Sequence, residues 1–257
     1  MSGVLRRRAG AGFAVFTLVM VTAFAGLGIW QLQRRDQKHA LIALLNERLA
    51  AAPVALLAPS QWNALTPAKD EFRRVSFTAT YRLPDAMVYS AGSAVRDDVS
   101  GPGTWAFLPA RLPGGELIVV NTGFVQNTMQ DRAQQDRAVG RLVTGQPAQL
   151  TGYIRFPESA GTLTPSENIE KRLWFTRDHL AMARALRWDE GGKDIAPFYL
   201  DLEQPAPESG IPKPGPLTVH LKDDHLQYAI TWFALAFAVV IAFGVWWRGQ
   251  RRLVQRP

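Results

Sequence analysis

The sequence predicts an α+β membrane protein in which two transmembrane helices flank a strand-rich, mainly antiparallel periplasmic domain. Two uncharged runs predict the helices, residues 9–33 and residues 226–247. Each run reaches the roughly 20 residues that an α-helix needs to cross a bilayer. A third observation predicts the domain: between residues 72 and 202, short runs rich in β-branched and aromatic residues alternate with turn residues, a pattern typical of strands.

The first uncharged run is predicted to be a retained transmembrane helix, residues 9–33, which follows a cytoplasmic tail of residues 1–8. A cleaved signal peptide is the alternative, because Arg6–Arg8, the apolar stretch and the small-residue triplet Ala23–Ala25 fit that pattern. The apolar stretch continues through Trp30, whereas the apolar core of a signal peptide is normally only about 7–15 residues long. The length therefore favours an anchor.

Arginines at the two ends of the chain set the expected orientation. The chain has 29 Lys and Arg against 22 Asp and Glu, and its net charge of +7 comes from three arginines before residue 9 and four after residue 247. Because arginines concentrate on the cytoplasmic side of a membrane, we expect both tails, residues 1–8 and 248–257, in the cytoplasm. The excess charge then indicates topology in a lipid bilayer, and no nucleic-acid partner is expected. The lack of a long Arg- and Ser-rich presequence favours a bacterial inner membrane.

The segment after the first helix is predicted to remain helical before the strands begin. Residues 34–52 form this extension, because they are rich in strong helix formers and Pro53 is the first residue that must end the helix. The periplasmic domain is expected over residues 53–202. A Pro-rich linker, residues 203–222, then leads to the second transmembrane helix, residues 223–247.

Alternation of apolar and polar residues locates the elements of the domain. The predicted strands are residues 74–81, 86–90, 104–111, 116–125, 149–156 and 195–202. Residues 113–115, Pro-Gly-Gly, are expected to form a hairpin turn. Two polar helices are expected at residues 129–139 and 176–186, the second with Asp178 near its positive end.

The sequence contains no recognised catalytic motif, and we expect the protein not to be an enzyme. It has no nucleophile-elbow, P-loop, dinucleotide-binding, zinc-protease or EF-hand pattern. It has no cysteine and only four histidines, which argues against a structural zinc site. A membrane-anchored enzyme with an unfamiliar site, acting on lipid or cell-wall substrates, is the alternative.

His225, at the start of the second transmembrane helix, is the candidate site residue. At 100° per residue, Tyr228 and Trp232 fall at about 300° and 340° from His225, so the three share one face. A neutral imidazole above two aromatic rings is suited to bind haem iron and to hold a flat macrocycle. The alternative is an aromatic belt that anchors the helix at the level of the lipid headgroups.

The outer end of the first helix carries a matching polar strip. Gln31, Arg35 and Lys38 recur there at helical spacing, at the depth where the second helix enters the membrane. Arginines at this depth are suited to bind carboxylates such as haem propionates. Contact with lipid headgroups is the alternative.

Four short motifs stand in a specific order along the chain. They are Gly28-x-Trp30-Gln31-x-x-Arg34-Arg35-x-x-Lys38, Arg73-Arg74-Val75, Asn121-x-Gly123 and His225-Leu-x-Tyr228-Ala-x-Thr231-Trp232-Phe233. This order, over residues 26–240, resembles the surfeit locus protein one family. The resemblance implies an assembly factor for haem–copper cytochrome c oxidase, which binds haem a at the outer membrane face and aids its insertion into oxidase subunit I. It also implies haem a synthase as a further partner, and a haem-free scaffold that holds oxidase subunits is the alternative.

The resemblance assigns cofactor binding to residues of the first and last motifs. His225 would be the ligand of the haem iron, and the other expected haem a-binding residues are Trp30, Gln31, Arg34, Arg35, Tyr228 and Trp232. The chain departs from the family pattern at two places. Asn121-Thr122-Gly123-Phe124 stands where the family typically has Asn-Arg-Gly-Trp, and Asp224 stands where an Asn usually precedes the histidine. The Asp224 carboxylate is expected to orient the imidazole or to raise its basicity.

Overall fold

The protein divides into two compact units. The chain begins in the first unit, passes through the second and returns to the first. A computed structural model of the chain describes residues 2–82, 86–91, 96, 98–99, 101–126, 132–188, 194–218 and 223–254. One unit consists of Met1–Ala43 and Leu221–Pro257, and the other consists of Leu44–His220. The first unit contains one apolar helix and most of the other, and the second unit contains all the strands that the structure describes.

Both apolar helices are long and continuous. Helix α1 runs from Ser2 to Ala50, and helix α5 runs from His225 to Val254. Each includes a segment long and apolar enough to cross a membrane, Gly10–Ala50 and His225–Arg251. Because no proline precedes Pro53, nothing interrupts the hydrogen-bond ladder of α1. The predicted first transmembrane helix and its helical extension therefore form one helix.

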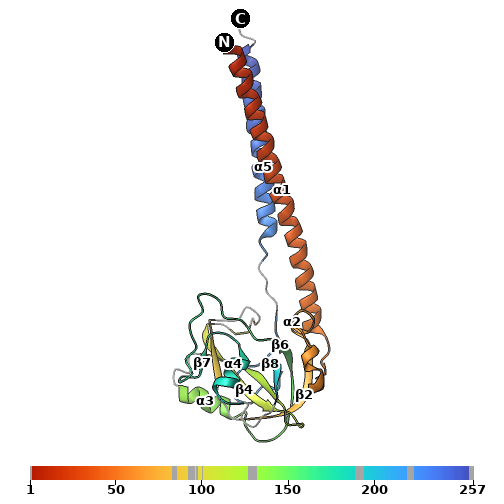
Figure 1. The fold of residues 1–257 in the computed structure, drawn as a ribbon, viewed down its shortest axis with the longest axis vertical. Coiled ribbons are helices and arrows are strands. Elements are labelled where there is room, and N and C mark those ends of the chain that lie inside the picture. The colour runs from red at the N-terminus through yellow and green to blue at the C-terminus, as the bar shows by residue number, and fades with distance from the viewer. Residues whose placement is uncertain are drawn as a thin grey trace. The chain divides into compact units, whose positions relative to one another are not determined.

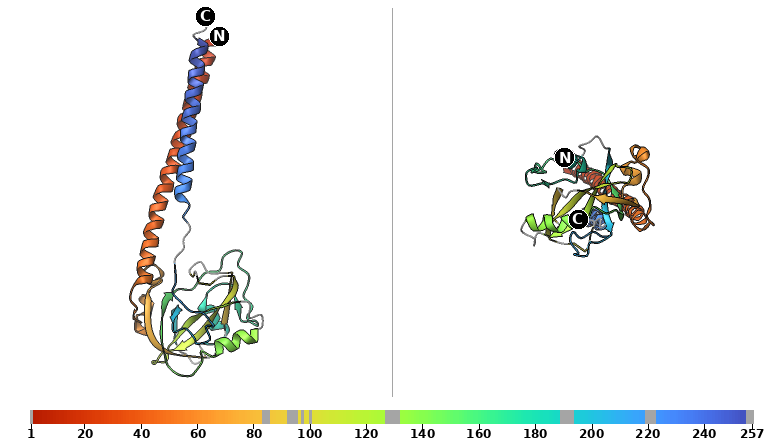
Figure 2. Two further views of the ribbon diagram at one scale, coloured as in Figure 1. Left: turned by 180° about the vertical axis from the view of Figure 1, so that it is seen from behind. Right: turned by 90° about the horizontal axis from the view of Figure 1, so that it is seen from below.

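Helices α1 and α5 lie side by side and run antiparallel, so that the two chain termini are at the same end (Figures 1 and 2). The less exposed side chains of α5 recur at alternating spacings of four and three residues, which is typical of a seam between paired helices. These seam residues are His225, Ala229, Trp232, Ala236, Val239, Phe243 and Trp246. Aromatic contacts with α1 fill the seam: the ring centroids of Phe24 and Trp232 are 5.7 Å apart, and those of Phe13 and Trp246 are 4.7 Å apart.

Five strands of the other unit close into a barrel. In spatial order they are β2 (Arg74–Tyr81), β6 (Ala148–Arg155), β8 (Ile195–Gln204), β5 (Leu117–Gln126) and β4 (Pro102–Arg111). The ring closes because Thr80 and Tyr81 of β2 pair with Arg111 and Ala110 of β4. Alternate side chains of these strands are buried in one apolar cluster, so the barrel interior is a packed core.

Shorter elements extend the barrel and cover its outer side. Strand β1 (Val54–Ala55) pairs with β2, β3 (Ala86–Ala91) pairs with β4, and β7 (Leu173–Trp174) pairs with β3. Helices α3 (Arg132–Gly140) and α4 (His179–Ala185) lie outside the strands (Figure 1). Met182 of α4 packs with Trp105, Phe107 and Tyr199 in a second apolar cluster. The barrel wall is therefore buried on this side as well.

The sheet is mixed, so the prediction of a mainly antiparallel domain is wrong. Strand pairs β1–β2, β3–β7 and β5–β8 are parallel. Between β5 and β8 the chain passes through α3, β6, β7 and α4. A connection of this length lets the returning strand pair in parallel, whereas a tight hairpin forces an antiparallel pair.

The positions of the predicted strands are confirmed. Strand β2 has the predicted bounds, and β3, β4, β5, β6 and β8 begin and end within two residues of them. The Pro-Gly-Gly turn is also present, because the N–H of Leu112 donates to the carbonyl of Glu116 across the β4–β5 hairpin.

The two polar helices of the domain are present. Helix α4 begins three residues later than predicted, because Asp178 caps it: its Oδ1 accepts a 2.9 Å hydrogen bond from the N–H of Ala181. Residues 129–131 of the other predicted helix lie outside the described residues. The 3-10 helix η1 (Pro59–Ala64) and the one-turn helix α2 (Pro67–Asp70) were not predicted.

The last seven residues of α1, 44–50, belong to the barrel unit. Leu49 is buried with Tyr153 and Leu217. Arg48 donates hydrogen bonds to the backbone carbonyls of Ala68 and Glu71 at 3.0 and 3.2 Å. These contacts fix the helix end on the barrel, just before Pro53 turns the chain into β1.

Candidate functional site

His225 begins α5 and lies in the seam with α1. Its Nδ1 is 2.7 Å from the Oε1 of Gln31, which comes from α1, 194 residues earlier in the chain. The backbone N–H of His225 donates a 3.0 Å hydrogen bond to Asp223. Within the described part of the chain, Nε2 of His225 makes no hydrogen bond. The imidazole is therefore held through one ring nitrogen only.

Asp223 makes a second polar link between the two helices. Its Oδ1 accepts the hydrogen bond from the backbone of His225, and its Oδ2 is 2.7 Å from Nε2 of His39 on α1. The hydrogen bond from the His225 backbone and that from His39 lower the pKa of the Asp223 carboxyl below its usual range. An anionic side chain that accepts from the first N–H of α5 is favourable at the positive end of the helix.

Three predicted site residues lie in or beside the seam. Gln31 contacts His225, and Trp232 lies two turns further along α5, stacked on Phe24. Arg35 follows Gln31 by one turn of α1 and is half-buried. Gln31, His225 and Trp232 therefore share one interface, which combines polar groups at its end with an aromatic surface below them.

The other three predicted site residues lie on exposed flanks of the helix pair. The side chains of Trp30 and Tyr228 are 50% and 55% exposed. Arg34 is exposed and donates a 3.1 Å hydrogen bond to Gln37 of its own helix. The structure therefore does not bring these residues into contact with His225.

Sequence reasoning missed the roles of His39 and Asp223. In the sequence His39 is only one of four histidines, and none of the predicted motifs includes Asp223. One signal could have pointed to this place: two aspartates, residues 223–224, directly precede an apolar helix, where a carboxylate can accept from the unpaired N–H groups of the first turn. No local pattern could have paired Asp223 with His39, since the contact joins two distant segments.

The Asn121–Phe124 motif lies in β5, and its side chains bind neighbouring strands of the barrel. The side-chain amide of Asn121 donates to Oδ1 of Asp201 at 2.6 Å, and its Oδ1 accepts from the N–H of Gly123 at 3.3 Å. Thr122 donates to the backbone carbonyl of Ala106 at 2.9 Å. These residues are buried, so they hold neighbouring strands together and are not available to a ligand at the surface.

Part of the Pro-rich linker packs against this motif. Phe124 and Lys213 form an isolated bridge with two backbone hydrogen bonds of 3.0 and 2.9 Å. Arg96, itself buried, donates to the carbonyls of Lys213 and Pro214. We call residues 211–217 the strap, because Ile211, Pro212, Pro214, Gly215 and Leu217 are buried or half-buried on the barrel.

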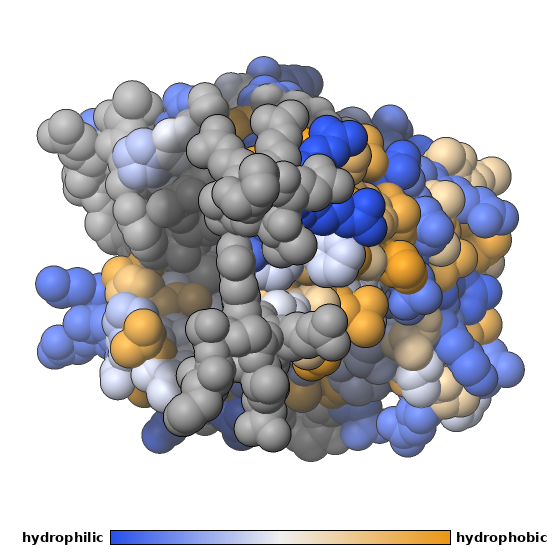
Figure 3. Space-filling view, turned by 90° about the horizontal axis from the view of Figure 1, so that it is seen from above, coloured by the Kyte–Doolittle hydropathy of each residue, from blue (hydrophilic) through white to orange (hydrophobic). Residues whose placement is uncertain are grey.

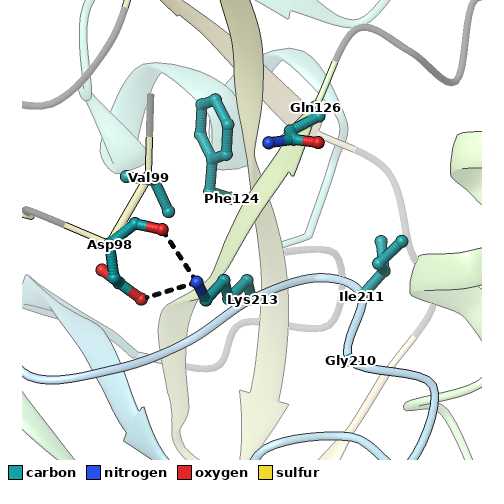
Figure 4. A pocket seen from close by; sticks show the side chains of 7 residues that line it. All are labelled: Asp98, Val99, Phe124, Gln126, Gly210, Ile211 and Lys213. Atoms are coloured by element: carbon teal, nitrogen blue, oxygen red, sulfur yellow. Dashed lines mark hydrogen bonds and ion pairs between the residues drawn. The ribbon is translucent and has the colours of Figure 1, made fainter. Parts of the chain in front are cut away.

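A hollow of about 200 Å³ opens beside the strap (Figure 4). The residues that line it are Asp98, Val99, Phe124, Gln126, Gly210, Ile211 and Lys213. Its charged groups are paired with each other: Nζ of Lys213 is 2.8 Å from the backbone carbonyl of Asp98 and 3.0 Å from its carboxylate. The ion pair therefore holds the strap in place and leaves little charge for a ligand.

Other surfaces offer no competing site among the residues that the structure describes. A second hollow, of about 440 Å³, contains the Arg74–Glu203 ion pair and is open to solvent. No group of three or more His, Asp or Glu residues able to hold a metal ion occurs in the described ranges. In the coloured part of the face shown in Figure 3, hydrophilic and hydrophobic residues are mixed. The polar end of the helix seam remains the strongest candidate.

Together, the fold and the site define a class of protein. Two apolar helices long enough to span a membrane come before and after a small mixed barrel in the chain, and a histidine lies where the helices meet. The chain belongs to the SURF1 family, whose sequence model matches residues 18–237 and so includes every predicted site residue. The resemblance found in the motifs is thereby confirmed.

Known relatives match over most of the chain. It is 31% identical to a SURF1-like protein of Monosiga brevicollis, over 98% of this chain and 94% of that protein. It is 32% identical to Surfeit locus protein 1 of Rattus norvegicus, over 86% of this chain and 70% of that protein. A SURF1-like protein of the bacterium Rickettsia bellii is 26% identical over 86% of this chain and 85% of its own length.

Proposed function

We propose that this protein is an assembly factor for haem–copper cytochrome c oxidase, which binds haem a at the outer face of the bacterial inner membrane and aids its insertion into subunit I. Membership of the SURF1 family, a family of oxidase assembly factors, supports the assembly role. The single observation that carries the haem role is the contact between His225 and Gln31, because it leaves Nε2 of the imidazole without a hydrogen-bond partner among the described residues.

The residues at the end of the seam fit a haem cargo. A neutral imidazole nitrogen is a common axial ligand of haem iron, and Nε2 of His225 is the available nitrogen. Trp232 and Phe24 supply a stacked aromatic surface in the same seam for the apolar macrocycle. Arg35, half-buried one turn from Gln31, and the exposed Arg34 are the cations that would bind propionates.

The charge distribution supports the proposed orientation. The arginines at both chain ends favour cytoplasmic tails, which would put the barrel unit and the His225 end of the helix pair on the periplasmic side. Haem a synthase would then supply the cargo and subunit I would receive it, both within the same membrane.

The proposal is tested by purifying the full-length protein from cells that make haem a. The wild-type protein should carry haem a, visible as a Soret band, and His225→Ala should lose it. His39→Ala is the matched control, since it removes a histidine that also links the two helices but keeps the proposed ligand. Equal amounts of haem in wild type and His225→Ala would exclude His225 as the ligand.

A haem-free scaffold is the second candidate, and one observation favours it. Gln31–His225 and His39–Asp223 both join α1 to the start of α5, so the histidine has a structural contact as well. A protein that restores oxidase assembly in a deletion strain, and yet shows no Soret band after purification from haem a-producing cells, would be such a scaffold.

A further inference from the structure

We infer that Gln31 is a positioning residue for His225: by accepting a hydrogen bond from Nδ1–H, it fixes the tautomer in which Nε2 has a free lone pair. This inference rests on the proposed function, because it concerns the same imidazole. In this role Gln31 acts on the tautomer of His225 and does not contact haem a directly.

The tautomer follows from the atoms in contact. Oε1 of an amide is a hydrogen-bond acceptor and never a donor, and it lies 2.7 Å from Nδ1 of His225. With the amide in this orientation, Nδ1 carries the proton. A neutral imidazole has a single N–H, so Nε2 is unprotonated. Histidines that bind metals commonly donate their other N–H to an oxygen in this way, which fixes the ring and raises its basicity.

Two contacts together fix the imidazole. Gln31 binds the ring from α1, and Asp223 binds the backbone N–H of the same residue from the turn before α5. Gln31 lies on the regular backbone of α1 and is half-buried in the seam. Since neither contact uses Nε2, that nitrogen stays available to a ligand.

A reversed amide would give the opposite chemistry. If the NH₂ group of Gln31 faced the ring, it would donate to Nδ1, and Nε2 would then carry the proton and could not bind iron. The two arrangements therefore predict opposite protonation of the same two nitrogens, which can be measured without any haem.

Nitrogen-15 NMR of the full-length protein, with labelled histidine and reconstituted in lipid nanodiscs, tests the inference. The spectra are recorded at pH 9, well above the ordinary histidine pKa of about 6.5, and the His225 signals are assigned from their loss in His225→Asn. We expect a protonated Nδ1 and an unprotonated Nε2 in the wild type. Gln31→Glu, which keeps an acceptor oxygen, should preserve this tautomer, and Gln31→Leu should shift the population towards Nε2–H.

The matched control is Gln33→Leu, the same substitution on an exposed position two residues along α1, which should leave the His225 signals unchanged. A wild-type protein with Nε2 protonated, or a Gln31→Leu spectrum identical to that of the wild type, would overturn the inference.

Titration with haem a separates this inference from the proposed function. Loss of the Gln31 contact should weaken haem a binding by about 10- to 100-fold, the range for such supporting contacts, and Gln31→Glu should restore most of it. Equal affinity of Gln31→Leu and wild type would overturn the positioning role. Absence of haem binding by the wild type would instead refute the proposed function, while the tautomer measurement would still decide the role of Gln31.

Discussion

Gly123 lies directly against the backbone of Lys213: a Cβ at Gly123 would be 2.3 Å from the carbonyl carbon of Lys213. Gly123 also has a φ of +127°, which residues with side chains rarely adopt. The close approach lets the strap form its bridge to Phe124. Packing of the strap on the barrel therefore explains the glycine at position 123. This explanation does not depend on which residue occupies position 122.

Replacement of Gly123 by alanine should destabilise the barrel unit by about 3 kcal/mol, because backbone strain and overpacking each cost roughly 1–3 kcal/mol. In a unit of this size, that lowers the midpoint of thermal unfolding by roughly 6–12 °C, measured by near-UV circular dichroism. Gly145→Ala is the control, since Gly145 has a positive φ of 75° but no atom within 4 Å of its Cβ position. It should cost only about 1 kcal/mol. Equal losses in the two variants would mean that the strap does not depend on the close approach.

Replacement of Arg155 by glutamine should cost about 3–5 kcal/mol, the usual effect of breaking a buried ion pair. The buried guanidinium binds Glu71 at 2.6 Å and Asp201 at 2.7 Å, so its loss leaves two carboxylates without their cation. The midpoint of thermal unfolding of the full-length protein measures the change.

Arg73→Gln provides the comparison for Arg155→Gln. Arg73 pairs with Asp70, but 40% of its side chain is exposed, and such pairs contribute only about 0–1 kcal/mol. If the two variants unfold at the same temperature, the Arg155 network does not stabilise the barrel.

The sequence could predict the strands of the barrel but not their partners. Val75, Phe77, Ala79 and Tyr81 alternate with polar residues because the side chains of a strand point to opposite faces in turn. That alternation is the same in a parallel and an antiparallel pair. Neither the parallel β5–β8 pair nor the closure of the ring at Tyr81 could therefore be derived from it.

The candidate site, too, could be predicted only in part. Helical periodicity placed His225, Tyr228 and Trp232 on one face, and two of them lie in the seam. The seam passes through Ala229, at 40° from His225, and Trp232, at 340°, so it is too narrow to include Tyr228 at 300°. The contact between Gln31 and His225 joins two helices 194 residues apart, and no periodicity within one helix reports such a pairing.

His179 should make the stability of the barrel unit depend on pH. Its side chain is fully buried in the described structure, Nε2 donates to the carbonyl of Ala196, and Nδ1 has no hydrogen-bond partner. Burial lowers the pKa of His179 to about 4, whereas the unfolded chain has a value near 6.5. As the pH falls below about 6.5 the unfolded state binds the proton first, so stability is lost between about pH 6.5 and pH 4, by up to roughly 3 kcal/mol.

The variant His179→Gln isolates this effect. Its amide NH₂ can replace the Nε2–H donor towards Ala196, and it does not titrate. Denaturant unfolding of both proteins between pH 7 and pH 4 should give a stability that falls less steeply for His179→Gln than for the wild type. Identical slopes would show that His179 is not kept neutral by its burial.

The α1–α5 seam predicts which positions can be joined by a covalent link. The chain has no cysteine, so Phe24→Cys combined with Trp232→Cys introduces the only two thiols, at positions whose rings are 5.7 Å apart. A short thiol-specific crosslinker should join them in membranes, and after proteolysis within the barrel unit the two fragments should remain together on a denaturing gel. Ala23→Cys with Trp232→Cys is the control, because Ala23 is exposed and its Cβ points about 100° away from that of Phe24. The variant with Phe24→Cys and Trp232→Cys should crosslink at least several-fold faster than this control, because position 24 lies in the seam. Equal rates would mean that the two helices do not pair through this face in the membrane.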